Sequence, residues 1–557
     1  MKKLLALLLL FPYSLSFGQV STVDSLPKEN LNWYNLSPKN DKIQGVGVDR
    51  AYSELLKDKK SKKTIVVAII DAGVDINHDD LSSLIWVNEN EIAGNGKDDD
   101  NNGYIDDING WNFLGNSKGE NINEANLELT RIVRNYSDQF EGKTATDIPE
   151  IDKVNFDLYS RAKNERLEID KKYTAKAKKY EELKDNLSEA ETVLKKELKK
   201  EELSLEDVQN FSATDSVLLK HKSTCTSMYT RGVSVDYLEG IVEYFETYTK
   251  YYTNLDFNPR AEIIGEIDKD LKNNNYGNSE VKGADAMHGS FVAGIIGGIR
   301  GNGIGIEGIA DNVRFMVLRA VPNGDEHDKD IAHSIRYAVD NGANIINMSF
   351  GKYYSPYKSE VNAAVKYAAS KGVLMIKASG NDETNIDKKT QYPNPITEDG
   401  SRIPNWITVG ANNQLMGKKL SATFSNYGIE NVHIYAPGVG IISTVPDSQY
   451  DMANGTSFAC PVVSGVAALV WSYYPELTVG ELKEILLSTG TNYKKKKVYQ
   501  PGYTKEEQTK TKFGKLSSSG SIVNAYNALF EAEIIVKEKA RKVAEDALRN
   551  EIQKKKG

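Results

Sequence analysis

The sequence predicts an α/β protein built on a doubly wound parallel sheet, with a mainly α-helical insertion. After residue 281, short apolar runs alternate with helical patterns, which is typical of such sheets. Residues 64–70 form a continuous, largely β-branched run, as expected for a strand buried on both faces. Between these parts, residues 118–270 are dense in charge and helix-forming residues and poor in Gly and Pro.

The other elements of the sheet domain are predicted from the same patterns. Further strands are expected at residues 314–319, 344–348, 373–378 and 406–409, and helices at 48–57, 329–341 and 359–371. The apolar run 462–471 predicts a buried helix, and residues 534–557 predict a lysine-rich amphipathic helix.

Length and composition limit the class of protein. A chain of 557 residues is expected to form two or three domains. Its 70 basic and 78 acidic residues argue against a nucleic-acid partner. Two cysteines, Cys225 and Cys460, provide no disulfide framework, although a single bridge between them stays open. No later apolar run is long enough to cross a membrane.

The N-terminus has the pattern of a secretory signal. Lys2 and Lys3 precede a short apolar core at residues 4–11, and residues 16–18 offer small side chains for a signal peptidase. We therefore expect residues 1–18 to be a cleaved signal peptide and the protein to be exported, to a periplasm or out of the cell. The alternative, a buried N-terminal strand or helix, fits the two lysines less well.

Apolar residues of the insertion recur at heptad-like spacing, which Lys176 interrupts. They are Ile169, Tyr173, Tyr180, Leu183, Leu187, Ala190 and Leu194. Residues 239–252 form a second, tyrosine-rich helical stretch. A helical hairpin or small bundle packed on itself is the favoured interpretation. A surface that contacts substrate or a partner protein is the alternative.

Ser457 lies directly before the predicted buried helix, in the stretch Asn-Gly-Thr-Ser-Phe-Ala-Cys-Pro at residues 454–461. The first turn of a helix leaves backbone N–H groups unpaired, and the helix dipole favours an oxyanion there. Ser457 is therefore a candidate nucleophile. Taken alone, the stretch also fits an ordinary helix start with Thr or Ser as the N-cap.

Asp71 and His288 are the candidate partners of this serine. Asp71 ends the strand at 64–70, and open α/β sheets bind ligands at the carboxyl ends of their strands. A structural Asp that caps the next turn is the alternative. His288 begins a helix of small residues, so its imidazole is expected to project toward the same rim, whereas the other five histidines lack this Gly-flanked setting.

Asn381 follows another predicted strand, in the run Ala-Ser-Gly-Asn at residues 378–381. A side-chain amide that donates to a developing oxyanion accelerates acyl transfer by about two to three orders of magnitude. Asn381 is therefore a candidate oxyanion donor, with an ordinary turn residue as the alternative.

An acidic loop at residues 98–107 is a candidate calcium site. It places oxygen ligands at alternate positions around a Gly turn, as calcium loops of the Asp-x-Asp-x-Asn-Gly type do. The ligands expected are Asp98, Asp100, Asn102, Tyr104 and Asp106. The twelfth position is Asn109 rather than the Glu of a full EF-hand. A solvated acidic turn is the alternative.

Four motifs now stand in one order along the chain. They are Asp-x-Gly-Val-Asp, His-Gly-Ser-x-Val-Ala-Gly, Ser-Gly-Asn and Gly-Thr-Ser-x-Ala-x-Pro. With them, residues 60–115 and 280–530 resemble the subtilisin-like serine proteases, the subtilases. The resemblance implies a triad of Asp71, His288 and Ser457, with Asn381 and the Ser457 N–H forming the oxyanion hole.

The resemblance also implies which segments line the substrate cleft. They are Ser349, Phe350 and Gly351, and Ala378, Ser379 and Gly380, where an extended peptide would add as a strand. Three features depart from the family pattern: the long separation of Asp71 from His288, Gly-Ser-Phe after His288 instead of Gly-Thr-His, and Cys460 in place of a small polar residue. Residues 19–60 are also too short for the usual folded inhibitory propeptide.

The expected organisation follows from these parts. Residues 1–18 are the signal peptide, 19–60 an N-terminal extension, 61–117 and 271–531 the subtilisin-like catalytic domain, 118–270 the helical insertion and 532–557 a helical tail. The expected activity is serine endopeptidase cleavage of polypeptides through an acyl-enzyme. The competing interpretation is a binding or scaffold protein on a degenerate protease fold, which the large insertion motivates.

Overall fold

The computed structural model describes residues 26–265 and 270–556, so the expected signal peptide lies outside the described residues. The chain divides into two compact units. One contains residues 124–258, and the other contains the described residues on either side of that segment. The insertion boundaries expected from composition, 118 and 270, lie six residues before the start and twelve residues after the end of the second unit.

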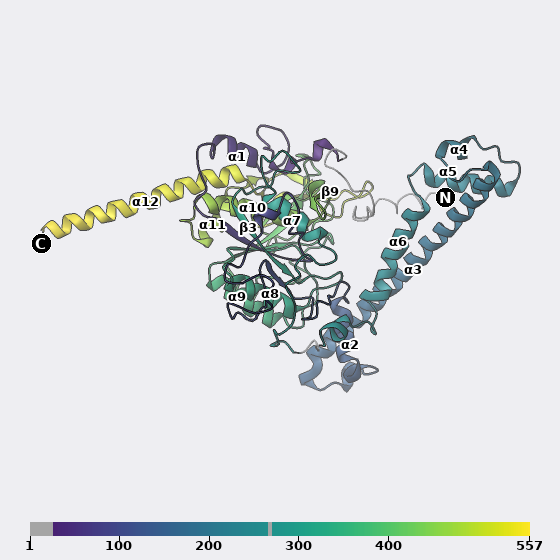
Figure 1. Ribbon diagram of the computed structural model, residues 1–557, viewed down its shortest axis with the longest axis horizontal. Helices are drawn as coiled ribbons and strands as arrows, with labels where there is room; N and C mark the ends of the chain where they lie inside the picture. Colours follow the sequence, from purple (N-terminus) through teal and green to yellow (C-terminus); the bar gives the residue numbers. More distant parts are fainter. Residues whose placement is uncertain (1–25, 266–269, 557) are drawn as a thin grey trace. The chain divides into compact units, whose positions relative to one another are not determined.

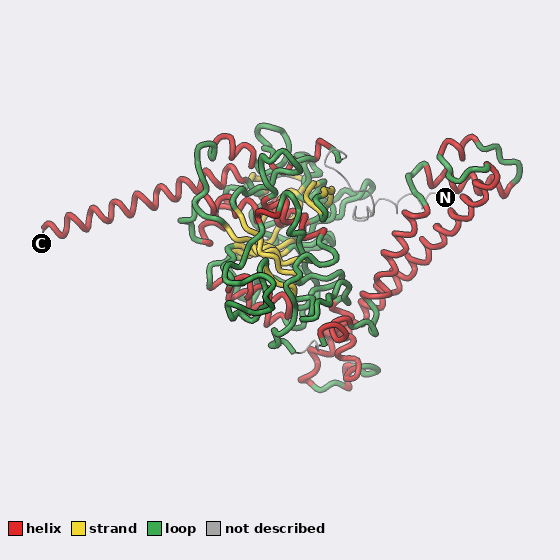
Figure 2. Tube along the Cα trace, viewed as in Figure 1, coloured by secondary structure: helices red, strands yellow, loops and turns green. Residues whose placement is uncertain are grey.

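The larger unit is organised around one nine-stranded sheet, whose strands gather at its centre in Figure 2. Neighbouring strands are parallel except for β10, which runs antiparallel to β13 at one edge. In spatial order the strands are β10 (Thr491–Asn492), β13 (Ser521–Ile522), β7 (Ile434–Pro437), β6 (Trp406–Asn412), β5 (Leu374–Ala378), β4 (Ile345–Met348), β1 (Ile65–Asp71), β3 (Val313–Arg319) and β2 (Gly110–Asn112). The observed topology confirms the predicted doubly wound α/β fold.

Successive side chains of β1 enter two different cores, because strand side chains alternate between the faces of a sheet. Ile65, Val67 and Ile69 belong to one core, whereas Ala68 and Ile70 belong to the other. This double burial explains the uninterrupted apolar run in the sequence. In register, β1 pairs with β3 from Ile65 opposite Val313 to Asp71 opposite Arg319.

Helices cover both faces of the sheet (Figure 1). The first core contains residues of α1 (Val48–Glu54), α7 (Met287–Gly297), α10 (Thr456–Tyr473), α11 (Val479–Ser488) and α12 (Ala525–Lys556). The second contains residues of α8 (Asp328–Asp340) and α9 (Lys358–Ser370). The helix α10 is almost wholly buried, as its apolar sequence predicts.

Residues 26–60 belong to the larger unit and contribute to its core. Trp33 and Tyr34 are fully buried. The Trp33 indole donates to the Gly440 carbonyl at 3.0 Å, and the Tyr34 hydroxyl donates to the Glu307 carbonyl at 3.2 Å. This part of the chain, expected as an extension preceding the catalytic domain, is therefore packed against that domain's loops.

Two hairpins complete the larger unit. The strands β8 (Ile441–Val445) and β9 (Gln449–Ala453) pair antiparallel, directly before α10. The Ser443 and Thr444 hydroxyls donate to carbonyls of α7 at 2.7 Å, which ties this hairpin to the helix that carries His288. The second hairpin joins β11 (Lys497–Tyr499) to β12 (Lys510–Lys512).

The smaller unit is helical. Its helices are α2 (Glu128–Phe140), α3 (Lys153–Leu198), α4 (Leu205–Asn210), α5 (Ser216–Tyr229) and α6 (Val235–Thr247). The 46-residue α3 packs lengthwise against α6 (Figure 1). Side chains of Ser204, Asp215 and Ser234 cap the starts of α4, α5 and α6, satisfying backbone donors that a helix start leaves unpaired.

Tyrosines close the contact between α3 and the segment that follows α6. Tyr173 stacks on Tyr248 with ring centroids 3.5 Å apart, and Tyr180 packs against Phe245. Of the heptad-like positions, Tyr180, Leu187, Ala190 and Leu194 are buried. The helices thus form the predicted hairpin, and these apolar side chains of α3 pack against other helices of the same unit.

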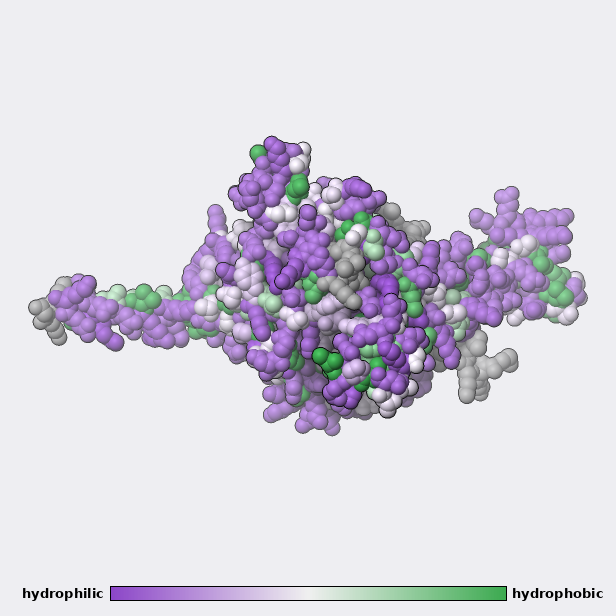
Figure 3. Space-filling model, turned by 90° about the horizontal axis from the view of Figure 1, so that it is seen from below, coloured by the Kyte–Doolittle hydropathy of each residue, from purple (hydrophilic) through white to green (hydrophobic). Residues whose placement is uncertain are grey.

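Hydrophilic side chains cover most of the surface seen in Figure 3, with hydrophobic ones in small separate patches. Among the described residues, one helix is long and apolar enough to match the composition of a membrane span. That helix is α10, which is buried inside the larger unit.

Candidate active site

Asp71 and His288 meet at the carboxyl edge of the sheet. Asp71 is the last residue of β1, and His288 is the second residue of α7. The Asp71 Oδ1 atom lies 2.7 Å from the His288 Nδ1 atom. The close approach depends on Gly289, because a Cβ there would lie 2.0 Å from the Gly73 carbonyl oxygen.

Burial and charge act in opposite directions on His288. Burial lowers the pKa of the imidazole, but the charge of Asp71 and its hydrogen bond to the ring outweigh this effect. The net result is a pKa above the ordinary value of 6.5. The arrangement therefore orients the ring, makes it a stronger base, and stabilises the imidazolium that forms when the ring accepts a proton during the reaction.

Asp71 itself is almost completely buried, at 2% exposure. Its Oδ1 atom accepts from the Ala72 N–H at 2.8 Å in addition to His288. Its Oδ2 atom has no hydrogen-bond partner among the described residues. Burying a carboxylate without a cation is costly. The Asp71 carboxylate is therefore placed to stabilise the positive charge of His288 whenever the ring is protonated.

Ser457 is the second residue of α10 and is anchored to the end of β4. The Ser457 hydroxyl donates to the Ser349 carbonyl at 2.8 Å, and the Ser349 hydroxyl donates to the Ser457 carbonyl at 2.8 Å. Phe458, the next residue, packs against His288 with ring centroids 5.5 Å apart. The structure thus brings the start of α10 beside the histidine, while the serine hydroxyl itself is turned to Ser349.

The N-cap of α10 is Gly455, which has no side chain that could cap the helix. The alternative drawn from the sequence, an ordinary start capped by Thr or Ser, is therefore wrong. The Ser457 N–H has no hydrogen-bond partner in the described part of the chain, as expected for the first turn of a helix.

Thr456 links Asn381 to this helix start. The Asn381 Oδ1 atom accepts from the Thr456 N–H and from the Thr456 hydroxyl, both at 2.9 Å. The same hydroxyl accepts from the Gly380 N–H at 3.0 Å. Because the oxygen end of the amide is held by two donors, the NH₂ end of Asn381 points the other way, and Asn381 is exposed.

The segments expected to line a cleft follow two neighbouring strands. Ser349, Phe350 and Gly351 follow β4, whereas Ala378 ends β5 and Ser379 and Gly380 follow it. The two strands pair in parallel up to Met348 opposite Lys377, so both segments begin at the same edge of the sheet. Gly351 is exposed and Phe350 and Gly380 are half-buried, whereas Ser349, Ala378 and Ser379 are buried.

Lys377 is a charged residue beneath these segments that sequence reasoning missed. It is 2% exposed, and its Nζ atom donates to the Gln391 side chain at 2.7 Å and to the Ala378 carbonyl at 2.8 Å. Burial lowers the pKa of Lys377 to about 8, against the opposing charge of Glu326. Lys377 is the only charged residue of an otherwise apolar strand. Nothing in that pattern predicts the hydrogen bonds that its side chain makes.

Cys460 lies one turn after Ser457 and is fully buried. Burial raises the pKa of its thiol to about 12, so the group stays protonated at neutral pH. Its Sγ atom donates to the Asn347 side chain at 3.3 Å. Cys225 and Cys460 are both free.

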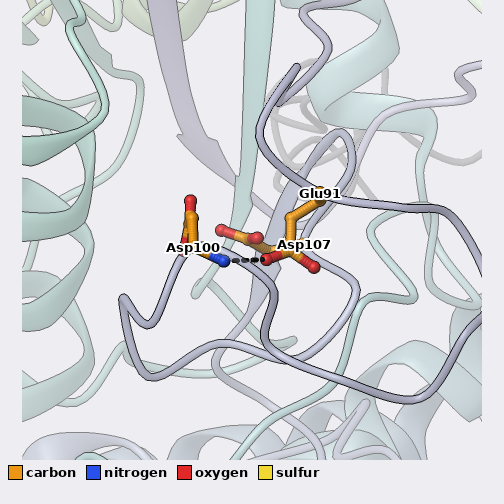
Figure 4. A group of neighbouring side chains, drawn as sticks. All are labelled: Glu91, Asp100 and Asp107. Carbon is orange, nitrogen blue, oxygen red and sulfur yellow. Dashed lines mark hydrogen bonds between the residues drawn. The ribbon is translucent and has the colours of Figure 1, made fainter.

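In the loop expected to bind calcium, some carboxylates accept backbone N–H groups and others gather in one group. Asp98 accepts from the Asn102 and Gly103 N–H groups, and Asp106 accepts from the Asn95 and Gly96 N–H groups. Asn102 and Tyr104 are half-buried and buried, respectively. Of the five expected ligands, only Asp100 belongs to the group of carboxylates that gathers here, together with Glu91 and Asp107 (Figure 4).

Comparison with known proteins identifies the family of this chain. The model of the subtilase family matches residues 62–508, so the chain belongs to the subtilase family. Alkaline elastase YaB from Bacillus sp. (strain YaB) is 37% identical over 206 residues, which cover 37% of this chain and 50% of the elastase. Subtilisin DY from Bacillus licheniformis is 35% identical over 208 residues, covering 37% of this chain and 70% of the subtilisin.

Solved structures give a more partial likeness. A protease from Pseudoalteromonas arctica matches with a TM-score of 0.36 and 26% identity, covering 46% of this chain and 79% of that one. A cold-adapted subtilisin-like serine proteinase matches with a TM-score of 0.34 and 28% identity, covering 42% and 76%. The matched region spans about half the length of the first curated relatives.

Proposed function

We propose that this protein is a serine endopeptidase that cleaves polypeptides through an acyl-enzyme intermediate. The observation that carries the proposal is the 2.7 Å contact between a buried carboxylate at a strand end and an imidazole at a helix start. Beside that pair lies a serine at the start of a buried helix. Membership of the subtilase family supports the same reaction class.

In this proposal Ser457 is the nucleophile and His288 its general base. The serine hydroxyl leaves the Ser349 carbonyl and gives its proton to the Nε2 atom of His288 as it attacks the scissile carbonyl carbon. His288 then protonates the leaving amine, and water repeats the sequence on the acyl-enzyme. Asp71 keeps Nδ1 protonated and stabilises the imidazolium that forms in both steps.

The proposed oxyanion hole consists of the Ser457 N–H and the Asn381 side-chain NH₂. Both donors lack partners among the described residues. The start of α10 and the loop that carries Asn381 are held together by the two hydrogen bonds from Thr456 to Asn381. A fixed donor that needs no reorientation stabilises the tetrahedral oxyanion more than the planar carbonyl. The segments after β4 and β5 would hold the peptide in extended form.

The experiment is hydrolysis of casein and of a fluorogenic peptide library by the purified protein, read by mass spectrometry. The proposal predicts internal cleavage that Ser457→Ala abolishes. The matched control is Ser464→Ala, which alters a buried serine two turns along the same helix and should leave the cleavage pattern unchanged. Turnover that survives Ser457→Ala would overturn the proposal, as would an inactive wild-type protein that folds normally.

We also propose that the protein is exported, on the signal-like pattern of residues 1–18. Calcium is proposed as a structural cofactor of the acidic loop rather than a participant in the reaction, because the three reacting groups already supply a nucleophile, a base and an orienting acid. For the helical unit we propose contact with protein substrates, since it interrupts the chain between Asp71 and His288.

A further inference from the structure

A lysine and a glutamine end between the segments after β4 and β5 that are proposed to hold the peptide. A Cβ added to Gly351 would lie 2.8 Å from the Lys377 Nζ atom. A Cβ added to Gly380 would lie 2.4 Å from the Gln391 Nε2 atom. Lys377 and Gln391 are only 2% and 6% exposed, whereas Gly351 is exposed and Gly380 is half-buried. The two polar ends therefore form the floor of the gap between the segments.

There is room beside both polar ends. Lys377 and Gln391 line a pocket together with Thr390, Pro393 and Asn394, among other residues. The glycines of the two segments add no side chain that would fill the gap from above. A substrate side chain can therefore approach the floor without displacing a side chain of Gly351 or Gly380.

The Lys377 ammonium has one donor left over. An ammonium has three N–H donors and no acceptor. Two of them reach the Gln391 Oε1 atom at 2.7 Å and the Ala378 carbonyl at 2.8 Å. Among the described residues, Lys377 has no third acceptor and forms no ion pair with a carboxylate. Burying a charge without a counter-ion is costly, so the ammonium lacks a negative partner here.

The hydrogen bond from Lys377 fixes the orientation of the Gln391 amide. Because an ammonium only donates, the amide oxygen must face Lys377, and the NH₂ group faces the other way, toward Gly380. In the described part of the chain, this NH₂ group donates to no acceptor. The floor thus presents two free donors, one charged and one neutral.

Two carboxylates act on Lys377 by charge without pairing with it. They are Glu326 and Asp382. Burial raises the pKa of Glu326, which reduces its negative charge near neutral pH. Asp382 is exposed, and its carboxylate accepts from the Tyr353 hydroxyl at 2.6 Å, so water and salt screen it. Burial lowers the pKa of Lys377 to about 8, which leaves the ammonium form dominant at neutral pH.

The reacting groups direct one substrate residue toward this floor. The Ser457 hydroxyl lies 2.8 Å from the carbonyl of Ser349, which begins one segment, and Asn381 directly follows the other. If Ser457 attacks a carbonyl held by Asn381, the residue that carries this carbonyl lies between the two segments. This step rests on the proposed endopeptidase function.

We propose that Lys377 and Gln391 select peptides with glutamate directly before the scissile bond. A carboxylate accepts from the ammonium and from the amide NH₂, and it supplies the missing negative charge. Glutamate suits the site better than aspartate, because both donors lie beneath the segments and the longer side chain reaches them. Lysine or arginine would meet a like charge, and an apolar side chain would leave two buried donors without acceptors.

The test compares kcat/KM for four fluorogenic peptides that differ only in having Glu, Gln, Leu or Lys before the cleaved bond. The wild-type protein should prefer Glu to Leu by about ten- to a hundredfold and cleave the Lys peptide most slowly. Lys377→Met nearly keeps the length of the side chain and removes its charge, so the Glu peptide should lose that advantage while the Leu peptide is still cleaved. The matched control, Lys371→Met, alters an exposed lysine in the turn before β5 and should leave all four values unchanged.

A second variant keeps the test valid if Lys377→Met does not fold. Gln391→Glu preserves the shape of the side chain and gives Lys377 an internal carboxylate, which should also abolish the preference for Glu. Wild-type cleavage of the Leu peptide that equals or exceeds that of the Glu peptide would overturn this inference and leave the proposed function standing. So would a Glu preference that survives in the folded variants. Failure of the folded wild-type protein to cleave any of the four peptides would overturn both.

Discussion

Thr456→Val tests whether the Asn381 amide is held in place by the residue before the proposed nucleophile. Thr456 is fully buried, and valine has nearly the same shape. The substitution removes one of the two donors to the Asn381 Oδ1 atom and the acceptor of the Gly380 N–H. The Thr456 N–H, which also donates to Asn381, remains.

The size of the effect follows from the one hydrogen bond lost to the amide. A net hydrogen bond contributes about 1 kcal/mol, and about 1.4 kcal/mol corresponds to a tenfold change in rate. We therefore expect kcat to fall about five- to tenfold with little change in KM, because the oxyanion exists in the transition state rather than in bound substrate. Asn381→Leu, which removes the donor itself, should lower kcat about 10²–10³-fold.

The assay is steady-state hydrolysis of one fluorogenic peptide by the two single variants and the double variant. Since Thr456 is argued to act through Asn381, the double variant should be no slower than Asn381→Leu alone. Multiplicative losses in the double variant would refute the positioning role. So would a Thr456→Val enzyme with unchanged kcat and altered KM.

Three further predictions concern the base, the fold and the helical unit. Asp71 raises the pKa of His288, and only the neutral ring accepts a proton, so Asp71→Asn should move the acidic limb of the kcat/KM profile to lower pH. It should also lower kcat by about 10⁴-fold; an unmoved limb would contradict the assignment. Asp330→Ala removes a buried carboxylate that pairs with Arg260 and should cost about 3–5 kcal/mol in urea unfolding, whereas a loss under 1 kcal/mol would contradict it. Replacing residues 124–258 by a short flexible linker should preserve hydrolysis of small peptides and reduce that of proteins; equal effects on both substrates would refute a role in protein recognition.

The sheet could be predicted because its strands are buried on both faces. Runs such as residues 64–70 and 373–378 carry few polar residues, and the observed β1 and β5 match them within one residue at each end. The short strands β2, β7, β10 and β13 of the same sheet went unpredicted. Two to four residues are too few for a periodic signal.

The contact of Asp71 with His288 could be expected because Asp71 ends a strand and His288 begins a helix at the same edge of the sheet. The residues that hydrogen-bond to the other site residues could not be predicted from the sequence. Thr456 looks like a helix cap in sequence, and its bonds to Asn381 and Gly380 depend on how α10 meets the end of β5. The hydrogen bond of Lys377 could not be predicted either, because its partner Gln391 lies 14 positions away in the sequence.

In the acidic loop, the spacing of the carboxylates does not tell which of them the fold buries. Alternate positions group Asp98 with Asp106, yet the chain turns so that both accept backbone N–H groups. The buried carboxylates instead come from Glu91, outside the motif, and from Asp107. Burial is a property of the folded loop, and no periodic pattern in these residues reports it.

The most direct test of the proposed triad is labelling with a fluorophosphonate, which reacts with a serine hydroxyl only when a base activates it. If Ser457 and His288 act as proposed, the purified protein is labelled stoichiometrically, the label maps to Ser457 by tandem mass spectrometry, and His288→Ala is not labelled. Labelling elsewhere, or equal labelling of Ser457 without His288, would contradict it.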